Sequence, residues 1–209
     1  MGGVRVRAIS PSLLVEEVAE RIAAAGGSWV RVAVDGAPPA GTEELADALV
    51  GPLRLRGRDV VRVSAVDFLR PASLRFEHGR TDPDVFYDEW LDSAALGREV
   101  LDPLGPGGSG RVLPALWDSS ADRAVRADYV SLKPGGVLLL DGALLLGRGM
   151  PFDLSVHLWL SPGALRRKVA AEDHWTLPAY ARYEQEGDPT HAADLVVRVD
   201  HPDRPAIVE

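Results

Sequence analysis

The chain has 209 residues, of which 46% are hydrophobic and 26% are charged, and its formal net charge is −8. This length and composition are typical of a globular domain that buries a core of its own. The acidic balance argues against nucleic acid or an anionic membrane as the main partner, because both select a basic surface. The sequence contains no cysteine, which excludes disulfides and thiolate metal sites.

No apolar run approaches the roughly 18 residues that a membrane-spanning helix needs. The first five residues, Met1 to Arg5, lack the apolar centre of a signal peptide. We therefore expect a cytoplasmic protein without membrane segments.

The first predicted helix begins at Ser10 and Pro11, a capping residue followed by the residue favoured at the first helical position. Leu14, Val18 and Ile22 recur at four-residue spacing, which predicts an apolar stripe facing a sheet. Two glycines at 26–27 end this helix.

Residues 28–34 read as a buried strand that runs into a loop and then a helix through about residue 50. Residues 51–57 are predicted to be a break, residues 59–66 a second strand, and residues 72–83 a surface loop. A helix is predicted over 84–101. Its candidate inner residues are Phe86, Trp90, Leu91 and Ala94.

The second half of the chain shows further strand patterns. Residues 111–118 and 124–126 read as a hairpin, and residues 137–142, 154–160 and 195–199 as strands. A helix follows Ser161-Pro162, whereas residues 173–191 are predicted to be irregular. Strands that alternate with helices predict an α/β fold, a mostly parallel sheet with helices on both faces.

Ligands bind such sheets at the carboxyl ends of the strands. The acids at these ends are Asp35, Asp67 and Asp141, and we expect them to converge if their strands are neighbours. The first strand also leads into the outline of a phosphate-binding loop, with glycines at 36 and 41. The candidate cofactor-binding residues are Gly36, Ala37, Ala40, Gly41, Thr42 and Glu43.

The order of several motifs resembles the uridine kinase-like branch of the P-loop kinases. The resemblance lies in the segments 67–71 (Asp-Phe-Leu-Arg-Pro), 79–88, 101–104, 114–118, 137–142 and 194–205, and it extends over residues 10–209. It implies a Rossmann-like P-loop NTPase fold in a single domain, residues 1–209. A small lobe or hairpin would cover about 68–130, and a reduced lid about 162–190.

The resemblance also implies a chemistry, the transfer of the ATP γ-phosphate to a nucleoside hydroxyl with the help of Mg²⁺. In such kinases a lysine bridges the phosphates, a serine or threonine holds Mg²⁺, and an Asp after the second strand accepts the proton. The implied catalytic residues are Asp67, Asp141 and the lid residues Arg166 and Arg167, with Lys168 beside them. Glu43 and Asp141 are the candidate Mg²⁺ ligands.

Three departures from the family pattern concern the reacting groups. Thr42 occupies the position of the lysine, and Glu43 places an anion where a neutral metal ligand is expected. Val66 stands at the position of the base, so that Asp67 could replace it only if the strand slips by one residue, which would turn its side chain to the other face. The lid is also poorer in basic residues after Lys168.

Each candidate site has a plainer alternative. Glu43 could simply favour the positive end of the helix dipole, Asp141 could be a turn residue before a glycine, and Asp67 could cap a loop. The lid arginines could belong to a solvated helix face. Three aromatic residues could stack on a nucleobase or belong to the core: Phe86, Tyr87 and Trp90.

The five histidines, at 78, 157, 174, 191 and 201, show no metal-ligand spacing, and His157 is predicted to be a packed strand residue. Two hypotheses follow. The first is a binding protein for a nucleotide, nucleoside or other phosphoryl ligand whose phosphotransfer is weak or lost. The second is an active ATP- or GTP-dependent nucleoside or small-molecule kinase with non-standard phosphate and metal ligands. The oligomeric state is left open.

Overall fold

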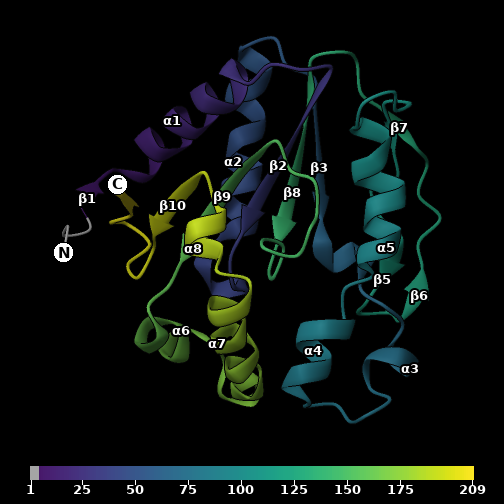
Figure 1. Cartoon of the computed structure of the whole chain (residues 1–209), viewed down its shortest axis with the longest axis vertical. Helices are drawn as coiled ribbons and strands as arrows, with labels where there is room; N and C mark the ends of the chain where they lie inside the picture. Colours follow the sequence, from purple (N-terminus) through teal and green to yellow (C-terminus); the bar gives the residue numbers. More distant parts are fainter. Residues whose placement is uncertain (1–4) are drawn as a thin grey trace.

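A seven-stranded sheet forms the centre of the computed structural model, with the strand order β1-β11-β10-β9-β2-β8-β3 (Figure 1). The strands are β1 (Val6–Ala8), β2 (Trp29–Asp35), β3 (Val60–Ser64), β8 (Gly136–Gly142), β9 (Leu154–Trp159), β10 (Leu195–Arg198) and β11 (Ala206–Val208). The five strands from β10 to β3 run parallel, whereas β11 is antiparallel to both β1 and β10. The prediction of a mostly parallel sheet is confirmed.

The structure describes residues 5–209. The prediction that the chain begins without a signal peptide therefore falls almost entirely outside the described residues. The helices are α1 (Pro11–Ala24), α2 (Thr42–Leu55), α3 (Ala72–Arg75), α4 (Pro83–Glu89), α5 (Ser93–Leu96), α6 (Pro162–Lys168), α7 (Leu177–Glu186) and α8 (Pro189–Ala192). Within the described range, no helix combines the length and the apolar character needed to cross a membrane.

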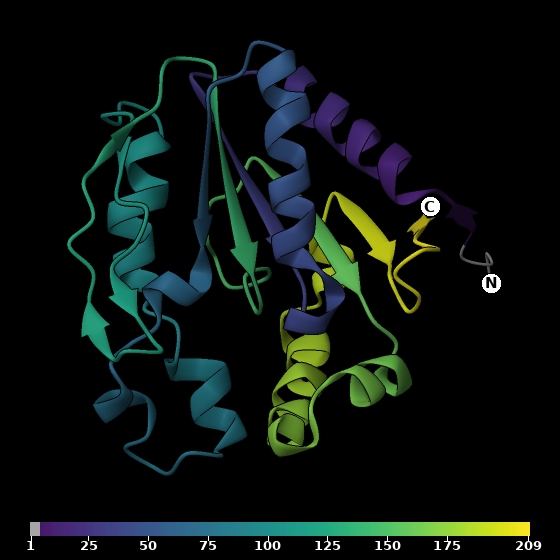
Figure 2. The ribbon, with the colours of Figure 1, turned by 180° about the vertical axis from the view of Figure 1, so that it is seen from behind.

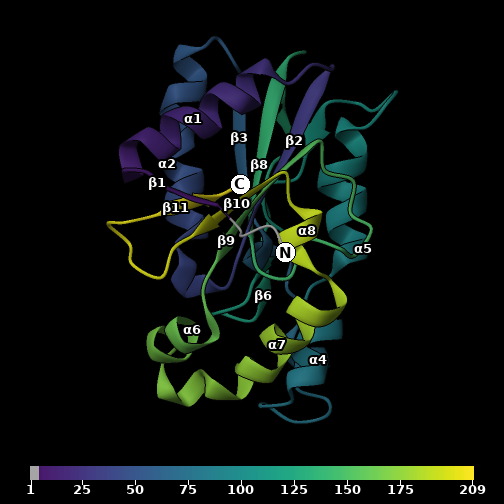
Figure 3. The ribbon, with the colours of Figure 1, turned by 60° about the vertical axis from the view of Figure 1, so that its left-hand side comes forward.

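Helices cover both faces of the sheet, as predicted. On one face, α1 and α2 pack against Val30, Val32 and Val34 of β2 (Figure 2). The other face carries two groups. The segment 93–104 packs against β3 and β8, and α7 packs near Ala33 of β2. Figure 3 shows α6 and α7 beyond the carboxyl ends of the strands, with α7 beside α4. The same end of the sheet holds the loop after β2.

The first helix matches its prediction. Ser10 Oγ accepts a hydrogen bond from the backbone N–H of Leu13 and caps α1. Leu14, Val18 and Ile22 are buried. The four-residue spacing thus identified the inner face of the helix correctly.

The predicted break at 51–57 is wrong, because α2 continues through Gly51 and Pro52 to Leu55. Leu49 and Leu53 lie four residues apart and are both fully buried in the core. Burial of two leucines stabilises the helix by a few kcal/mol, which offsets the loss of one helical hydrogen bond at a proline.

The predicted helix over 84–101 is interrupted. α4 ends at Glu89, and Asp92 starts a new helix by accepting a hydrogen bond from the N–H of Ala95. This new start changes the helical phase, so that Ala94 is exposed while Ala95 is buried. The segment continues as a π-helical turn, η3 (Gly97–Leu101), and a 3₁₀ turn, η4 (Asp102–Leu104).

The segment 111–131 forms two small antiparallel pairs. The predicted hairpin is present as β5 (Trp117–Asp118) and β6 (Arg123–Ala124). In contrast, β4 (Arg111–Val112) pairs with β7 (Val130–Ser131) and not within that hairpin. The sequence did not predict β11, whose three residues complete the edge of the sheet together with β1.

The prediction that residues 173–191 are irregular is wrong. A 3₁₀ turn, η5 (Ala171–Thr176), leads into α7 and α8. Pro178 lies in the first turn of α7, where proline is tolerated, and Ala179, Tyr180 and Tyr183 bury one face of this helix. The spacing of these three residues was the signal for a helix, and the polar residues between them masked it.

Candidate functional site

The loop after β2 is closed upon itself. Residues Pro38–Ala40 form a 3₁₀ turn, η1, in which Ala40 N donates to Ala37 O at 2.8 Å and Gly41 N to Pro38 O at 3.4 Å. The two prolines have no N–H to donate. None of residues 38–41 therefore offers an uncommitted N–H, whereas a phosphate-binding loop presents such groups to its anion.

Both loop glycines have a structural reason. A Cβ on Gly36 would lie 2.8 Å from the carbonyl oxygen of Leu158, so the loop can approach β9 only without a side chain. Gly41 adopts φ 87°, in the left-handed region that favours glycine. The glycines thus maintain the turn from β2 into α2 independently of any phosphate.

The residues at the start of α2 point in different directions. Thr42 is buried, and its methyl group would lie 3.2 Å from a Cβ on Gly36. Glu43 is exposed and pairs with Arg62 of β3, with its Oε1 at 3.3 Å from Nη2. The carboxylate of Glu43 is therefore held by a cation from another strand.

Arg62 pairs with three carboxylates at once. Its Nε lies 2.8 Å from Oδ1 of Asp141, and its Nη1 lies 2.8 Å from Oδ1 of Asp47, in addition to the contact with Glu43. Burial by itself would lower the pKa of Arg62, but the hydrogen bond and charge of Asp141, together with Glu43 and Asp47, raise it above its ordinary value. We call these four residues the Arg62 cluster.

Asp141 is the buried member of the Arg62 cluster, with 2% of its surface exposed. Its second oxygen accepts a hydrogen bond from Ser64 Oγ at 3.0 Å. Sequence reasoning singled out Asp141 and Glu43 but did not identify Arg62. The abundance of arginine in this chain hid the signal, and only the pairing of β3 with β8 places Arg62 beside Asp141.

The base candidates Val66 and Asp67 lie in a 3₁₀ turn, η2 (Ala65–Phe68), because β3 ends at Ser64. Side chains in this turn do not alternate between two faces as they do in a strand, so a register slip is not what decides the direction of Asp67. Partial burial, followed by the negative charge of Asp141, raises the pKa of Asp67. A raised pKa suits a general base.

The lid candidates Arg166 and Arg167 are exposed on α6. Neither forms an ion pair with any residue in the range 5–209, and the side chain of Lys168 is within 3.5 Å of Val199 O. The carbonyl of Arg166 contacts Nε2 of His174 at 3.1 Å. The two guanidinium groups thus remain available to a ligand or to solvent.

Asp35 does not converge with Asp141, contrary to expectation. In the parallel register Val34 lies opposite Asp141, so Asp35 points to the other face of the sheet. There Asp35 is fully buried and accepts a hydrogen bond from Leu145 N at 2.9 Å. The acids at the strand ends are therefore divided between two sites.

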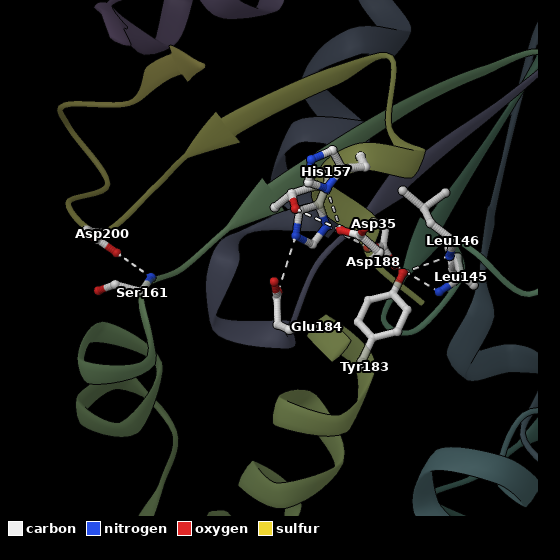
Figure 4. A network of polar contacts seen from close by, with 11 residues as sticks. Asp35, Leu145, Leu146, His157, Ser161, Tyr183, Glu184, Asp188 and Asp200 are labelled. Atoms are coloured by element: carbon white, nitrogen blue, oxygen red, sulfur yellow. Dashed lines mark hydrogen bonds and ion pairs between the residues drawn. The ribbon is translucent and has the colours of Figure 1, made fainter. Parts of the chain in front are cut away.

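Asp35 is the centre of a buried polar network (Figure 4). His157 of β9 contacts Asp35 Oδ2 through Nδ1 at 2.7 Å, and Tyr183 of α7 donates its hydroxyl hydrogen to the same oxygen at 3.0 Å. The Tyr183 hydroxyl in turn accepts from Leu146 N at 2.8 Å. His157 is packed, as predicted, but the network around it was missed because α7 was not predicted.

His157 is held between two carboxylates. Its Nε2 lies 3.8 Å from Oε1 of Glu184, too far for a hydrogen bond, and this buried nitrogen has no hydrogen-bond partner in the described chain. Burial by itself would lower the pKa of His157, but Asp35 and then Glu184 raise it to about 9. The ring is therefore an imidazolium at neutral pH, with an N–H on each side.

This raised pKa predicts a pH dependence of stability. The ordinary pKa of histidine is about 6.5, so the stabilisation from His157 is complete below pH 6.5 and is lost as the pH rises through about 9. We expect the free energy of unfolding to fall over this window by on the order of 3 kcal/mol more in the wild type than in His157→Asn. Urea denaturation between pH 6 and 9.5 measures it, and identical profiles would contradict it. Asp35, Glu184 and Tyr183 are the titratable groups that face the ring.

Two cavities lie at this end of the sheet. The α6–α7 cavity, of about 680 Å³, lies between the end of β9, α6 and α7, and includes His157 and Glu184. The β3–β8 cavity, of about 250 Å³, lies between the loop after β2, the ends of β3 and β8, and α4. Tyr180 and Leu144 line both.

The aromatic candidates line the β3–β8 cavity and also contact one another. Phe86 packs edge-on against Trp90 and Tyr180, with ring centres 5.0 and 5.8 Å apart. Tyr87 is buried beneath the guanidinium group of Arg148, 4.7 Å from the ring centre. Tyr87 is thus a core residue, whereas Phe86 and Trp90 are half-buried, and all three line the cavity.

The solved structures that resemble this one include the following three. The first is described as a possible uridine kinase from Bacillus stearothermophilus, with 18% identity, a TM-score of 0.71, and coverage of 87% of this chain and 96% of that chain. A candidate fructose transport system kinase from Silicibacter sp. TM1040 has 24% identity and a TM-score of 0.62, and the match covers 88% of this chain and 92% of that chain. The YGR205w protein has 11% identity and a TM-score of 0.60, and the match covers 94% of this chain and 96% of that chain. No protein-family model matches the chain, and no curated protein matches it in sequence.

The fold and the loop position define a class: the chain has the α/β fold of the P-loop kinases. The structures described as a possible uridine kinase and a fructose transport system kinase share this fold. The resemblance implies ATP with Mg²⁺ as the bound group, but the residues here do not fit that group. Glu43 and Asp141 already pair with Arg62, and within residues 5–209 no three acidic or histidine side chains are arranged to hold a metal ion.

Proposed function

We propose that this protein binds a nucleoside or a similar neutral small molecule in the β3–β8 cavity and that its phosphotransfer is weak or lost. The observation that carries the proposal is the Arg62 cluster. Arg62 holds Glu43 and Asp141, the two residues that would serve the metal. The charges of the cluster, one positive and three negative, leave a net charge of −2 beside the loop.

This charge favours a neutral ligand over a triphosphate. Two like unit charges about 4 Å apart repel by about 4 kcal/mol at an effective dielectric constant near 20, and the closed turn η1 offers no compensating N–H groups. The cavity of about 250 Å³ suits a ligand of one or two rings. A nucleoside meets both conditions, and its base would contact the edges of Phe86 and Trp90. A cytoplasmic location remains part of the proposal.

A thermal-shift and calorimetric screen tests this function. We expect uridine or cytidine to raise the melting temperature, and ATP with Mg²⁺ to leave it unchanged. Val66 lines the cavity and is 53% exposed, so Val66→Trp should fill the cavity and abolish binding without unfolding the protein. Val130→Trp, at another exposed position, is the matched control. Robust ATP-dependent phosphorylation of uridine, cytidine or another small alcohol would sink the proposal of weak or lost transfer.

The closed turn η1 predicts that restoring the family residues is not enough to restore nucleotide binding. Restoring the family residues with Thr42→Lys, Glu43→Ser and Val66→Asp should give little nucleotide binding as long as Pro38 and Pro39 keep η1 closed. Adding Pro38→Gly and Pro39→Gly should increase the affinity for ATP with Mg²⁺ at least tenfold. Calorimetry on both variants measures this, and equal affinities would show that the prolines do not close the site.

A second candidate is an active ATP- or GTP-dependent small-molecule kinase in which Arg166 and Arg167 replace the missing lysine. The raised pKa of Asp67 favours this candidate. Here Asp67→Asn should abolish phosphate transfer while leaving nucleotide binding intact. Calorimetry that detects no nucleotide binding up to millimolar concentrations would exclude it.

A further inference from the structure

We propose that the α6–α7 cavity is a second binding site, which takes a small, largely apolar molecule carrying a carbonyl and an N–H side by side, such as a lactam. His157 and Glu184 recognise these two groups. The proposal does not depend on the function of the β3–β8 cavity, because different residues carry it.

The unpartnered nitrogen of His157 is the first support. Only 3% of His157 is exposed, and its Nε2 is buried without a hydrogen-bond partner. Its Nδ1 is bound to Asp35, whose carboxylate also accepts from Tyr183 and from Leu145 N. This arrangement fixes the ring, so that Nε2 points away from Asp35 and toward Glu184 (Figure 4). A buried donor without an acceptor is unfavourable unless a ligand or water completes it.

The second support is the cavity itself. Both His157 and Glu184 belong to its wall. The rest of the wall is mainly apolar, with Leu158, Leu165 and Leu177 among its members, and it also includes Arg166 and His174. A volume of about 680 Å³ lies in the range of small-molecule sites, which are typically apolar with a few placed polar groups.

Among the polar groups of the wall, His157 and Glu184 lie close enough together for one ligand to contact both, and they define its chemistry. His157 offers an N–H, and Glu184 offers a carboxylate oxygen 3.8 Å away. A ligand carboxylate would be repelled by Glu184, and a simple ammonium group cannot accept from Nε2. A neutral ligand with adjacent acceptor and donor atoms satisfies both side chains. The Glu184 side chain is 39% exposed, so it can turn aside enough for a carbonyl oxygen to reach Nε2.

The test uses two matched probes, 2-quinolone and N-methyl-2-quinolone, measured by calorimetry on the full chain. We expect 2-quinolone to bind and the N-methyl compound, which has lost the donor, to bind about tenfold more weakly or worse. His157→Asn keeps a donor toward Asp35 but removes Nε2, and Glu184→Met removes the acceptor. Each should weaken binding of 2-quinolone about tenfold or more, whereas His191→Asn, at an exposed histidine, should not.

If a variant fails to fold, ¹⁵N NMR of the wild type still tests the proposal. In the wild type, addition of 2-quinolone should shift the ¹⁵N resonance of His157 Nε2 more than that of Nδ1. Equal affinity for the two probes, unchanged affinity in His157→Asn, or an unshifted Nε2 resonance would each overturn the proposal. The two sites are separable, because Val66→Trp should abolish uridine binding and leave 2-quinolone binding unchanged.

Discussion

Replacing Asp35 by alanine is expected to lower the free energy of unfolding by about 3–5 kcal/mol, the range typical of breaking a buried ion pair by removing one partner. Asp35 is fully buried and accepts hydrogen bonds from His157, Tyr183 and Leu145 N. Without it, the imidazolium of His157 and two further donors would be buried without an acceptor. Urea denaturation followed by circular dichroism at pH 7 measures the loss.

Two further variants make this result specific. Asp35→Asn keeps an acceptor for Tyr183 but removes the charge, and it should be less destabilising than Asp35→Ala. Asp203→Ala, at a side chain that is 86% exposed, should change stability by no more than about 0.5 kcal/mol. A loss below about 1 kcal/mol in Asp35→Ala would mean that the network does not hold α7 against the sheet.

Replacing Arg62 by methionine is expected to lower the free energy of unfolding by about 3 kcal/mol. The buried carboxylate of Asp141 would then keep only the hydrogen bond from Ser64. The exposed partners Glu43 and Asp47 contribute little to this loss, because solvent screens them. Denaturation at pH 7 gives the value, with Arg54→Met on the exposed face of α2 as the matched control.

A double-mutant cycle separates charge from packing at this position. In the Arg62→Met background, Asp141→Asn removes the unpaired charge and keeps a partner for Ser64. We expect this second substitution to recover about half or more of the lost stability, which gives a coupling energy of at least about 1 kcal/mol. Strict additivity of the two substitutions would show that Arg62 acts through its packing and does not neutralise Asp141.

Local patterns were reliable for elements with a strong apolar period. The four-residue spacing in α1 and the apolar runs of β2, β8 and β9 predicted these elements and hence the parallel sheet. They failed where long-range packing overrides local preference. The proline at position 52 would end an isolated helix, yet the helix continues because Leu53 is buried against the core.

The sequence by itself determined the fold class and the position of the loop between Gly36 and Gly41, and it predicted departures from a phosphate-binding motif at Thr42 and Glu43. These properties follow from residue type and spacing along the chain, which are readable without knowing what each side chain contacts.

Only the tertiary structure decided how the acids are used. The parallel register turns Asp35 and Asp141 to opposite faces of the sheet, and it places His157 opposite Asp35 and Arg62 in reach of Asp141. Asp35 and His157 are 122 residues apart in the chain, and Arg62 and Asp141 are 79 residues apart. No local pattern encodes such pairings, because they depend on which strands become neighbours when the core is buried.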